Sequence, residues 1–465
     1  MNPYNGDRPR RKSAVVLFLL VLIVAGLAAG AWYLRPRFES EPPQIVLKPD
    51  SDTVGTGPVD IVIADSGTGL KSIEVKLGDA TIASEQFAQP VATKTVTVVL
   101  SKLPGVKEGP AMLRVVARDA SLFRGNEAVL QKQITIDVTP PTIDLVADDR
   151  YVNFGGVGAI VYQASPDTVT SGVKIGGHFF SGARGVIKDH PERFFVLFAH
   201  AWDAPRDAKA VLVATDKAGN SREMPLAYEL KDFRYRKSTL TLSDGFLQTK
   251  VTPLADAAAR QGSPKDIFVA VNKKLRKENE DKITAITRKA SPSILWKGAF
   301  AQLSNSKVEA NFADHRTYVY NGEPIDTAYH LGYDLSVTKR YPVEAANSGA
   351  VVFAGDLGIY GNTVILDHGI GLFTLYGHLS QIDVKVGDAV EQRQVLGRTG
   401  ETGLAGGDHL HYGVYLHGVA VLPVEWWDPK WIEDNITPKL AGMAGEAIHE
   451  AQKPTKASRT GKRRR

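Results

Sequence analysis

The sequence predicts a mainly β fold with one N-terminal transmembrane helix, two β-sandwich modules, a short helical connector and a C-terminal antiparallel β-sheet domain. Three patterns support this prediction: a charge-free apolar run at 14–34, short β-branched runs between turn residues as far as 232, and a strand-and-glycine pattern rich in histidine after 300. The chain has 465 residues, 43% hydrophobic and 23% charged, which is an ordinary globular composition. This length predicts about two to four domains.

The run at 14–34, AVVLFLLVLIVAGLAAGAWYL, contains no charged side chain. As a helix that rises about 1.5 Å per residue, it spans the ~30 Å core of a bilayer. Basic residues precede it and Trp32 and Tyr33 end it, so the positive-inside rule places residues 1–13 in the cytoplasm and the remainder outside. A cleaved signal peptide is the alternative. The run is longer than the ~7 to 15 residues of a typical signal core, which favours an uncleaved, single-pass anchor in the cell membrane.

Residues 42–232 contain short runs such as IEVKL, TVTVVL and AVLVAT, separated by Gly, Asp, Asn and Pro. PPQIVL at 42–47 recurs as PPTIDL at 140–145, and VVARDASLFRGN at 115–126 recurs as LVATDKAGN at 212–220. This repeat predicts two tandem β-sandwich modules, residues 42–138 and 139–232. The modules resemble bacterial immunoglobulin-like repeats. We interpret them as spacers, because no metal-spaced cluster or aromatic patch stands out in them.

A connector with helices is predicted at 233–299. Ser263, Pro264 and Asp266 form a helix start, with a capping hydroxyl, a proline at the first helical position and an acid two residues further on. The charge-rich KKLRKENEDK that follows is typical of a solvated helix face. We expect this stretch to have a connecting or lid role and no chemistry of its own.

The C-terminal third holds most of the chain's histidines: seven of 11 lie within 315–417. The chain has no Cys, so a bound metal would need His, Asp or Glu ligands. His330 and Asp334, in YHLGYDLSV, are four residues apart and project to the same side of the backbone. His409 and His411, in DHLHYGVYLHG, alternate along a predicted strand and share one face. Two His and one carboxylate suffice for tetrahedral zinc with an open fourth position, which is the catalytic arrangement.

Between these motifs lies GNTVILDHGIGLFTLYGHLSQIDVKVGDAVEQRQVLGRTGETG, residues 361–403. With it, the chain from about 300 to 432 resembles the lysostaphin or LytM type of zinc endopeptidase, peptidase family M23. Members of that family carry H-x-x-x-D, V-x-I-x-H-G, Y-x-H-L, a glycine-rich repeat and H-L-H, and every motif occurs here in this order. The resemblance implies a LytM-type peptidase domain, which we place at 300–436.

The resemblance also implies five functional residues. His330, Asp334 and His411 would bind Zn²⁺, while His409 and His378 would be catalytic histidines that are not ligands. His409 is our candidate general base and His378 the donor that stabilises the oxyanion, although the two roles could be exchanged. The chain departs from the family in AGGDHLHY, where members often have Ser or Thr before G-P-H-L-H, and in lacking the Glu that often follows H-L-H. Neither change removes one of the five residues.

These expectations combine into a membrane-anchored, exported, zinc-dependent endopeptidase that cuts peptide stems or cross-links of peptidoglycan, with its catalytic domain on the periplasmic or wall side. A catalytically silent regulator or wall-binding module, which activates a partner hydrolase, is the main alternative. Degenerate members of that kind usually lack ligands, and all five residues persist here. A biotinyl or lipoyl carrier would share the hairpin pattern VKVGDAVEQRQVLG, but its exposed lysine has no match. An adhesin that uses the sandwiches is a third hypothesis.

The charge distribution concerns other partners. The net charge of +5 at pH 7 arises at the two ends, and residues 451–465 hold seven Lys and Arg with no acid. The body between the ends is slightly acidic, so we expect no nucleic-acid partner. We predict a basic disordered tail at 437–465 that attracts anionic wall polymers or lipids, with strong dependence on salt. For His368 we expect a turn position in the cleft wall, and His417 is too far along the strand to share an ion with His411.

Overall fold

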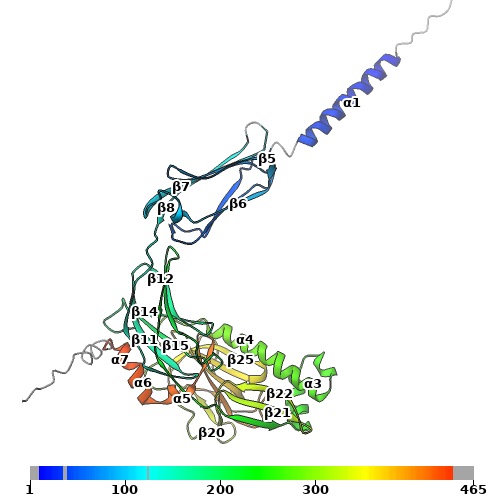
Figure 1. Cartoon of the computed structure of the whole chain (residues 1–465). Coiled ribbons are helices and arrows are strands. Elements are labelled where there is room, and N and C mark those ends of the chain that lie inside the picture. The colour runs from blue at the N-terminus through cyan, green and yellow to red at the C-terminus, as the bar shows by residue number, and fades with distance from the viewer. Residues whose placement is uncertain (1–9, 35–38, 123–124, 444–465) are drawn as a thin grey trace, which may run out of the picture. The chain divides into compact units, whose positions relative to one another are not determined.

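The computed structural model describes residues 10–34, 39–122 and 125–443. The fold is mainly β, as predicted, with an N-terminal apolar helix and many antiparallel sheets (Figure 1). Helix α1 (Arg10–Leu34) contains the apolar window Val15–Trp32, which is long and apolar enough to cross a membrane. A signal sequence would meet the same criterion. Residues 1–9 of the predicted basic segment at 1–13, and residues 444–465 of the predicted basic tail at 437–465, lie outside the described residues.

The chain divides into two compact units, residues 1–140 with 216–220, and residues 141–215 with 221–465. In the first unit, a three-stranded sheet consists of β1 (Gln44–Lys48), β3 (Val59–Ala64) and β6 (Thr93–Val98). A five-stranded sheet has the order β2 (Thr53–Val54), β8 (Glu127–Ile136), β7 (Gly109–Asp119), β4 (Leu70–Leu77) and β5 (Ala80–Val91), and the short helix η2 (Leu100–Lys102) follows β6. Every second residue of β3 is buried, and Ile61, Ile63, Val75 and Val115 form the centre of one core that both sheets share.

The second unit begins with two four-stranded sheets. One has the order β14 (Ala183–Arg184), β15 (Phe194–Ala199), β11 (Val157–Ala164) and β9 (Ile143–Ala147). The other has the order β13 (His178–Ser181), β12 (Thr168–Ile175), β16 (Val211–Asp216) and β17 (Ser221–Pro225), and β10 (Tyr151–Asn153) pairs with β18 (Glu229–Lys231). All six residues of β15 are buried, so this strand has protein on both faces.

The connector contains β19 (Lys237–Thr241), α2 (Asp244–Phe246), η3 (Leu247–Val251), η4 (Thr252–Leu254), η5 (Ala259–Gln261), α3 (Pro264–Ala270), η6 (Val271–Leu275) and α4 (Arg276–Thr287). The predicted helix start is confirmed, because the Ser263 hydroxyl accepts the Asp266 N–H and the Asp266 carboxylate bonds back in a capping box. Strand β19 was not expected there. It pairs in parallel with the hairpin that leads into the C-terminal sheet.

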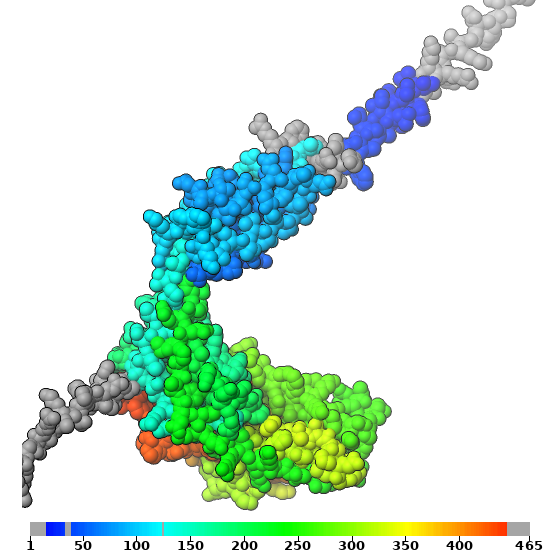
Figure 2. Space-filling model, in the orientation of Figure 1, coloured from blue at the N-terminus to red at the C-terminus, as the bar shows by residue number. Residues whose placement is uncertain are grey.

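The C-terminal sheet is eight-stranded. Its main path is β20 (Lys307–Ala310), β23 (Tyr333–Ser336), β31 (Leu410–Leu416), β27 (Leu372–Leu379), β26 (Asn362–Gly369), β25 (Gly349–Asp356) and β29 (Ala389–Val390), with β32 (Val419–Val421) paired to β31. The hairpin β21 (Asp314–Tyr320) and β22 (Glu323–His330) forms a sheet with β19, and β24 (Pro342–Glu344), β30 (Val395–Arg398) and β28 (Gln381–Ile382) form a small third sheet. Turn η7 (Gly358–Tyr360) precedes β26. In Figure 2 the light-green connector and the yellow part of the sheet share one face of this unit.

The second sandwich is not a separate compact body, because it shares one unit and one continuous hydrophobic core with the C-terminal sheet. Helices α5 (Pro423–Trp427) and α6 (Pro429–Asn435) follow the sheet. From α5, the buried Glu425 carboxylate accepts the Asn153 amide N–H at 2.7 Å and the Val157 backbone N–H at 2.8 Å. The Leu422 N–H donates to the Gly155 carbonyl at 2.8 Å. The sandwich is therefore fastened to the polypeptide that follows the catalytic motifs.

The predicted start of the disordered tail at 437 is also wrong. Residues 437–440 form α7 (Thr437–Leu440), and the described chain continues to Met443. The Lys439 ammonium is buried and pairs with the buried Asp149 carboxylate of the second sandwich. The Leu440 carbonyl accepts the Lys188 N–H at 2.9 Å. A buried, paired cation holds this segment in the fold, which its basic composition alone does not reveal.

Candidate functional site

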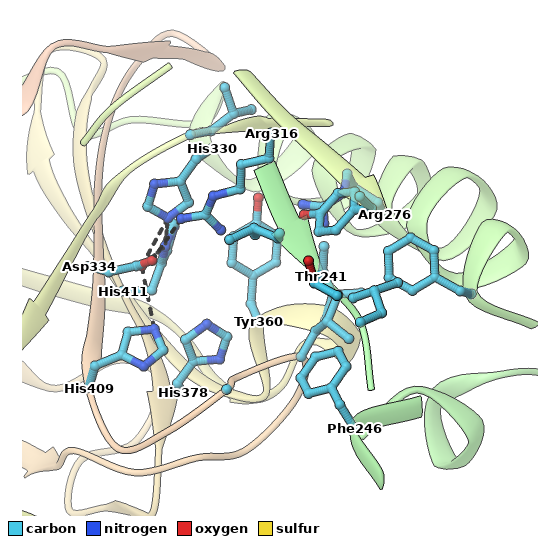
Figure 3. A pocket seen from close by; sticks show the side chains of 18 of the residues that line it. Thr241, Phe246, Arg276, Arg316, His330, Asp334, Tyr360, His378, His409 and His411 are labelled. Carbon is cyan, nitrogen blue, oxygen red and sulfur yellow. Dashed lines mark hydrogen bonds and ion pairs between the residues drawn. The ribbon is translucent and has the colours of Figure 1, made fainter. Parts of the chain in front are cut away.

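A cavity of about 380 Å³ lies in the second unit, with the C-terminal sheet on one side and the connector on the other (Figure 3). All five residues singled out from the sequence line it: His330, Asp334, His378, His409 and His411. A volume of a few hundred cubic ångströms is the usual size of a small-ligand or substrate pocket.

Three strands bring the metal-ligand candidates together. His330 is the last residue of β22, and the chain turns through Leu331 and Gly332 into β23, where Asp334 lies directly opposite His411 of β31 in antiparallel register. A Cβ atom at residue 332 would lie 2.7 Å from Nε2 of His411 and 2.6 Å from a backbone carbonyl oxygen. Only glycine fits there, which gives a steric reason for the glycine within H-L-G-Y-D.

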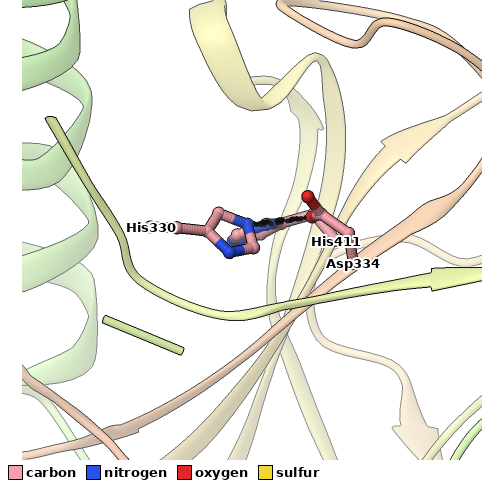
Figure 4. Close-up of side chains that lie close together, drawn as sticks. All are labelled: His330, Asp334 and His411. Carbon is pink, nitrogen blue, oxygen red and sulfur yellow. Dashed lines mark hydrogen bonds and ion pairs between the residues drawn. The ribbon is translucent and has the colours of Figure 1, made fainter. Parts of the chain in front are cut away.

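Three donor atoms converge at this point (Figure 4). The His330 Nε2 atom lies 2.9 Å from Asp334 Oδ1 and 2.9 Å from His411 Nδ1, and the latter two atoms are 3.1 Å apart. Ligand atoms at ~2.0 to 2.1 Å from a tetrahedral zinc ion lie about 3.3 Å from one another, so a triangle of this size suits such an ion.

The hydrogen bonds around the triangle also suit a cation. Nδ1 of His330 lies 3.0 Å from the Asn311 carbonyl oxygen and must donate its proton there, so a neutral His330 directs the lone pair of Nε2 toward the other two ligand atoms. Nε2 of His411 is buried without a hydrogen-bond partner among the described residues. Burial lowers the pKa of His411 to about 4, which keeps this imidazole neutral and able to bind a metal.

A buried arginine supports the carboxylate. The Arg316 guanidinium, on β21, donates through Nη2 to Asp334 Oδ2 at 3.0 Å, and its Nε lies 3.6 Å from the carboxylate of Asp314. Burial alone would raise the pKa of Asp334, but the surrounding imidazoles, His330 foremost, hold this pKa well below its usual range. Asp334 is therefore an anion whose Oδ2 is fixed by Arg316 and whose Oδ1 faces the histidines.

His409 lies beside the triangle, just before β31. Its Nδ1 is 2.7 Å from the Gly407 carbonyl oxygen, and its Nε2 is 3.4 Å from Asp334 Oδ1. Burial alone would lower the pKa of His409, but the Asp334 carboxylate outweighs it and raises the pKa. Because the Gly407 carbonyl can only accept, Nδ1 carries a proton, and a neutral His409 offers the lone pair of Nε2 to the cavity.

His378, near the end of β27, lies next to His409, with 4.8 Å between the ring centroids. Its Nδ1 is 2.8 Å from the Thr402 carbonyl oxygen, and burial holds the pKa of His378 well below its usual value. A neutral His378 in this tautomer accepts a hydrogen bond at Nε2 and cannot donate one. The oxyanion-donor role expected from the sequence would require its protonated form. His378 also has a φ of 63°, a strained value that proteins tend to keep at functional positions.

The other histidines among the described residues do not line the cavity. We expected His368 at a turn in the cleft wall, and this prediction is wrong. His368 is buried in β26, where its Nδ1 lies 2.8 Å from the Ser348 carbonyl oxygen and its Nε2 lies 2.7 Å from the Thr374 hydroxyl. Both ring nitrogens are therefore engaged in hydrogen bonds within the protein. His417 follows β31, and its ring lies against Phe180 of the second sandwich.

Sequence reasoning missed the opposite wall of the cavity. The connector contributes residues from β19, from the link between β19 and α2, and from α2, α3 and α4, namely Leu240, Thr241, Leu242, Ser243, Phe246, Phe268 and Arg276. Arg316 was also missed, although the alternation of Asp314 and Arg316 along one face of a strand was a readable signal. The connector residues carry no motif, because their position depends on how β19 pairs with β21.

Comparison with known proteins agrees with the motifs. Residues 328–423 match the model of peptidase family M23. The DD-carboxypeptidase/endopeptidase Mpg of Neisseria meningitidis serogroup B is 38% identical over 27% of this chain and 27% of its own length. The peptidoglycan DD-endopeptidase ShyA of Vibrio cholerae is 34% identical over 25% and 26%, respectively. The solved catalytic domain of lysostaphin from Staphylococcus simulans is 30% identical, with a TM-score of 0.24, over 28% of this chain and 98% of that one.

The chain therefore contains, toward its C-terminus, a peptidase family M23 domain of the LytM or lysostaphin type. It spans about a quarter of the length of the curated relatives that it matches. The matched region includes the five cavity histidine and aspartate residues, but the connector wall and both sandwiches precede it in the sequence.

Proposed function

We propose that this protein is a membrane-anchored, exported, zinc-dependent endopeptidase that hydrolyses peptide bonds in peptidoglycan. The observation that carries the proposal is the triangle of His330 Nε2, Asp334 Oδ1 and His411 Nδ1, with sides of 2.9 to 3.1 Å, beside two further imidazoles in one cavity. The M23 domain and its peptidoglycan-hydrolase relatives support the substrate class.

His330, Asp334 and His411 would hold the zinc ion. When bound, zinc supplies Lewis-acid polarisation of the scissile carbonyl and lowers the pKa of a water molecule toward ~7. Arg316 keeps the Asp334 carboxylate oriented, and the Asn311 carbonyl keeps His330 in the tautomer that binds through Nε2.

His409 is the general base in this proposal, because the Asp334 carboxylate, 3.4 Å from its Nε2, raises the pKa of His409 and so favours uptake of a proton. Once protonated, the same nitrogen can deliver the proton to the leaving amine. Neutral His378 acts as a second acceptor, which orients an N–H or O–H group of the reactants next to His409. Both rings are fixed through Nδ1 to backbone carbonyls, so neither has to reorient during the reaction.

Helix α1 would anchor the protein in the cell membrane and leave the two units outside the cytoplasm. Its apolar window, Val15–Trp32, has exposed side chains throughout, as expected for a surface that lipid covers. Fractionation of cells with antibodies to the C-terminal domain, before and after protease treatment of the outer face, tests this topology. Cleavage by the external protease supports it, and complete protection contradicts it.

The central test of the function uses the full chain, purified in detergent. We expect about one zinc ion per chain by atomic emission. Mass spectrometry of purified peptidoglycan after incubation should reveal newly cleaved peptide stems or cross-links, which a chelator prevents and added zinc restores. Stoichiometric zinc without cleavage would favour the alternative, a silent regulator that activates a partner hydrolase. Cleavage that a chelator does not affect would contradict the zinc mechanism.

A further inference from the structure

The cavity has two chemically different walls. The sheet side supplies the metal-ligand triangle and the two other histidines, whereas the connector side is mainly apolar, with Leu240, Phe246 and Phe268, and includes one cation, Arg276. Arg276 is the first residue of α4 and points to the same cavity as the triangle (Figure 3). A substrate that reaches the triangle therefore also meets the connector.

The two arginines that line the cavity differ in how their charges are balanced. Arg316 pairs with Asp314 and with Asp334. Arg276 forms no ion pair with any of the described residues. Its Nε and Nη2 atoms both donate to the neutral amide oxygen of Asn272, at 3.2 and 3.0 Å.

Asn272 makes Arg276 rigid. The Asn272 side chain is 2% exposed. Its amide nitrogen donates to the Asp326 carboxylate at 2.9 Å and to the Thr327 carbonyl at 3.2 Å. The Asp326 carboxylate also lies 3.5 Å from the Lys273 ammonium. The guanidinium of Arg276 is thus held in one orientation by a fixed amide, which reduces the entropy cost of binding a ligand.

Glu280, one turn further along α4, is the anionic group on the same helix that could balance Arg276. Burial raises the pKa of Glu280, although the charge of Arg276 opposes that rise, and no ion pair forms between them. A half-buried guanidinium with a neutral hydrogen-bond partner is a site that an anion would stabilise, and a carboxylate fits its planar donors especially well.

We propose that Arg276 determines specificity by binding a carboxylate of the peptide substrate in this cavity. The inference rests on the proposed peptidase function and adds which feature of the peptide is recognised. Every peptide chain ends in a carboxylate, and a cavity of about 380 Å³ has room for only a short segment between that group and the triangle. The enzyme therefore favours bonds that lie within a residue or two of a free carboxylate.

The test compares two forms of one substrate. The probes are cross-linked disaccharide-peptide dimers, released from peptidoglycan by a muramidase, either native or with their carboxylates converted to methylamides. The full-length protein should cleave native dimers with a kcat/KM at least about tenfold above that for amidated dimers, the effect expected of a charge-assisted hydrogen bond. Equal values for the two forms would overturn the proposal without any variant.

Arg276→Met then assigns the effect to this residue. It should lower kcat/KM for native dimers by about 10- to 100-fold and leave amidated dimers unchanged, so that the preference disappears. Arg276→Lys, which keeps the charge, should retain part of the preference and guards against a variant that misfolds. Lys277→Met removes the same charge from an exposed neighbour that pairs with Asp281, and it should retain the full preference. Equal losses on both substrates with Arg276→Met would show a merely structural role.

Binding separates this proposal from the proposed function. Calorimetric titration of native and amidated dimers into the His409→Ala protein measures recognition without cleavage. Tighter binding of native dimers that depends on Arg276, together with a wild-type protein that never cleaves, would retain the carboxylate site and reject the enzyme. Cleavage without any dependence on Arg276 would retain the enzyme and reject the carboxylate site.

Discussion

The two walls of the cavity differ in origin as well as in chemistry. The sheet wall carries all of the predicted catalytic and ligand residues, which lie at the end of β22, in β23, in β27 and at or just before the start of β31, and all five are within the region that matches the M23 family. The connector wall comes from residues 240–276, outside the matched region, and was expected to carry no chemistry. In our proposal, the sheet wall specifies which reaction can occur, and the connector wall restricts which peptides bind.

This division assigns different experimental consequences to the two walls. Changes in the sheet wall should alter zinc binding or the chemical step. Changes in the connector wall should alter KM or substrate preference, with zinc unaffected. Variants on each wall, measured in the full chain, test whether these two sets of effects are separate.

The largest effect is expected from His411→Ala. This change removes one of three ligand atoms that lie within 3.1 Å of one another, so zinc should be lost and cleavage should fall below detection. Zinc content by atomic emission and peptidoglycan digestion check both parts. A variant that retains one zinc per chain would remove His411 from the ligand set.

A smaller but still severe loss is expected from His409→Ala. The general base would be absent while the three ligands remain, so zinc content should be unchanged and the cleavage rate should fall by about 10²-fold or more. His378→Ala, measured beside it, shows how much the second acceptor contributes. Unchanged cleavage in His409→Ala would transfer the role of base to His378.

An intermediate effect is expected from Arg316→Met. The Asp334 carboxylate would lose its donor at 3.0 Å, and the loss of such an outer partner typically weakens metal affinity or activity by about 10- to 100-fold. Competition with a chromophoric chelator measures the zinc dissociation constant. If the affinity is the same as that of the wild type, Arg316 does not support the site.

The smallest effect is expected on the connector wall. Phe246→Ala removes a half-buried ring that lines the cavity, and the loss of about 1 kcal/mol of aromatic contact should raise KM by about fivefold with zinc content unchanged. Gln248→Ala, at an exposed position two residues away, is the matched control. A loss of zinc in Phe246→Ala would mean that the two walls are not independent.

The sequence was sufficient for the parts of the site that depend on local spacing. H-x-x-x-D and H-L-H predicted that His330, Asp334 and His411 come together, and the pairing of β23 with β31 places Asp334 opposite His411. It was not sufficient for contacts between distant segments. Strand β19 pairs in parallel with β21 of the hairpin, and Lys439 contacts Asp149, which lies 290 positions away in the chain. Neither contact produces a periodic pattern in the sequence.

The tautomers of His378 and His409 also could not be predicted from the sequence. Which nitrogen of His378 faces the cavity depends on the Thr402 carbonyl, 24 residues away, which lies in a loop rather than in a strand. The sequence analysis predicted different roles for the two histidines, with His409 as the base and His378 as the hydrogen-bond donor. Their hydrogen bonds give both neutral rings the same tautomer, in which Nδ1 donates to a backbone carbonyl and Nε2 carries the lone pair.

The parallel pairing of β19 with β21 has a consequence for exchanging parts between wall hydrolases. Strand β21 pairs with β22, and β22 ends in His330, so a ligand of the proposed ion is positioned by a strand that begins at Lys237. A graft that begins at residue 300, the predicted start of the peptidase domain, would lack β19, the connector wall and the second sandwich. We therefore expect a transferable form of the proposed enzyme to need the whole second unit, which begins at residue 141.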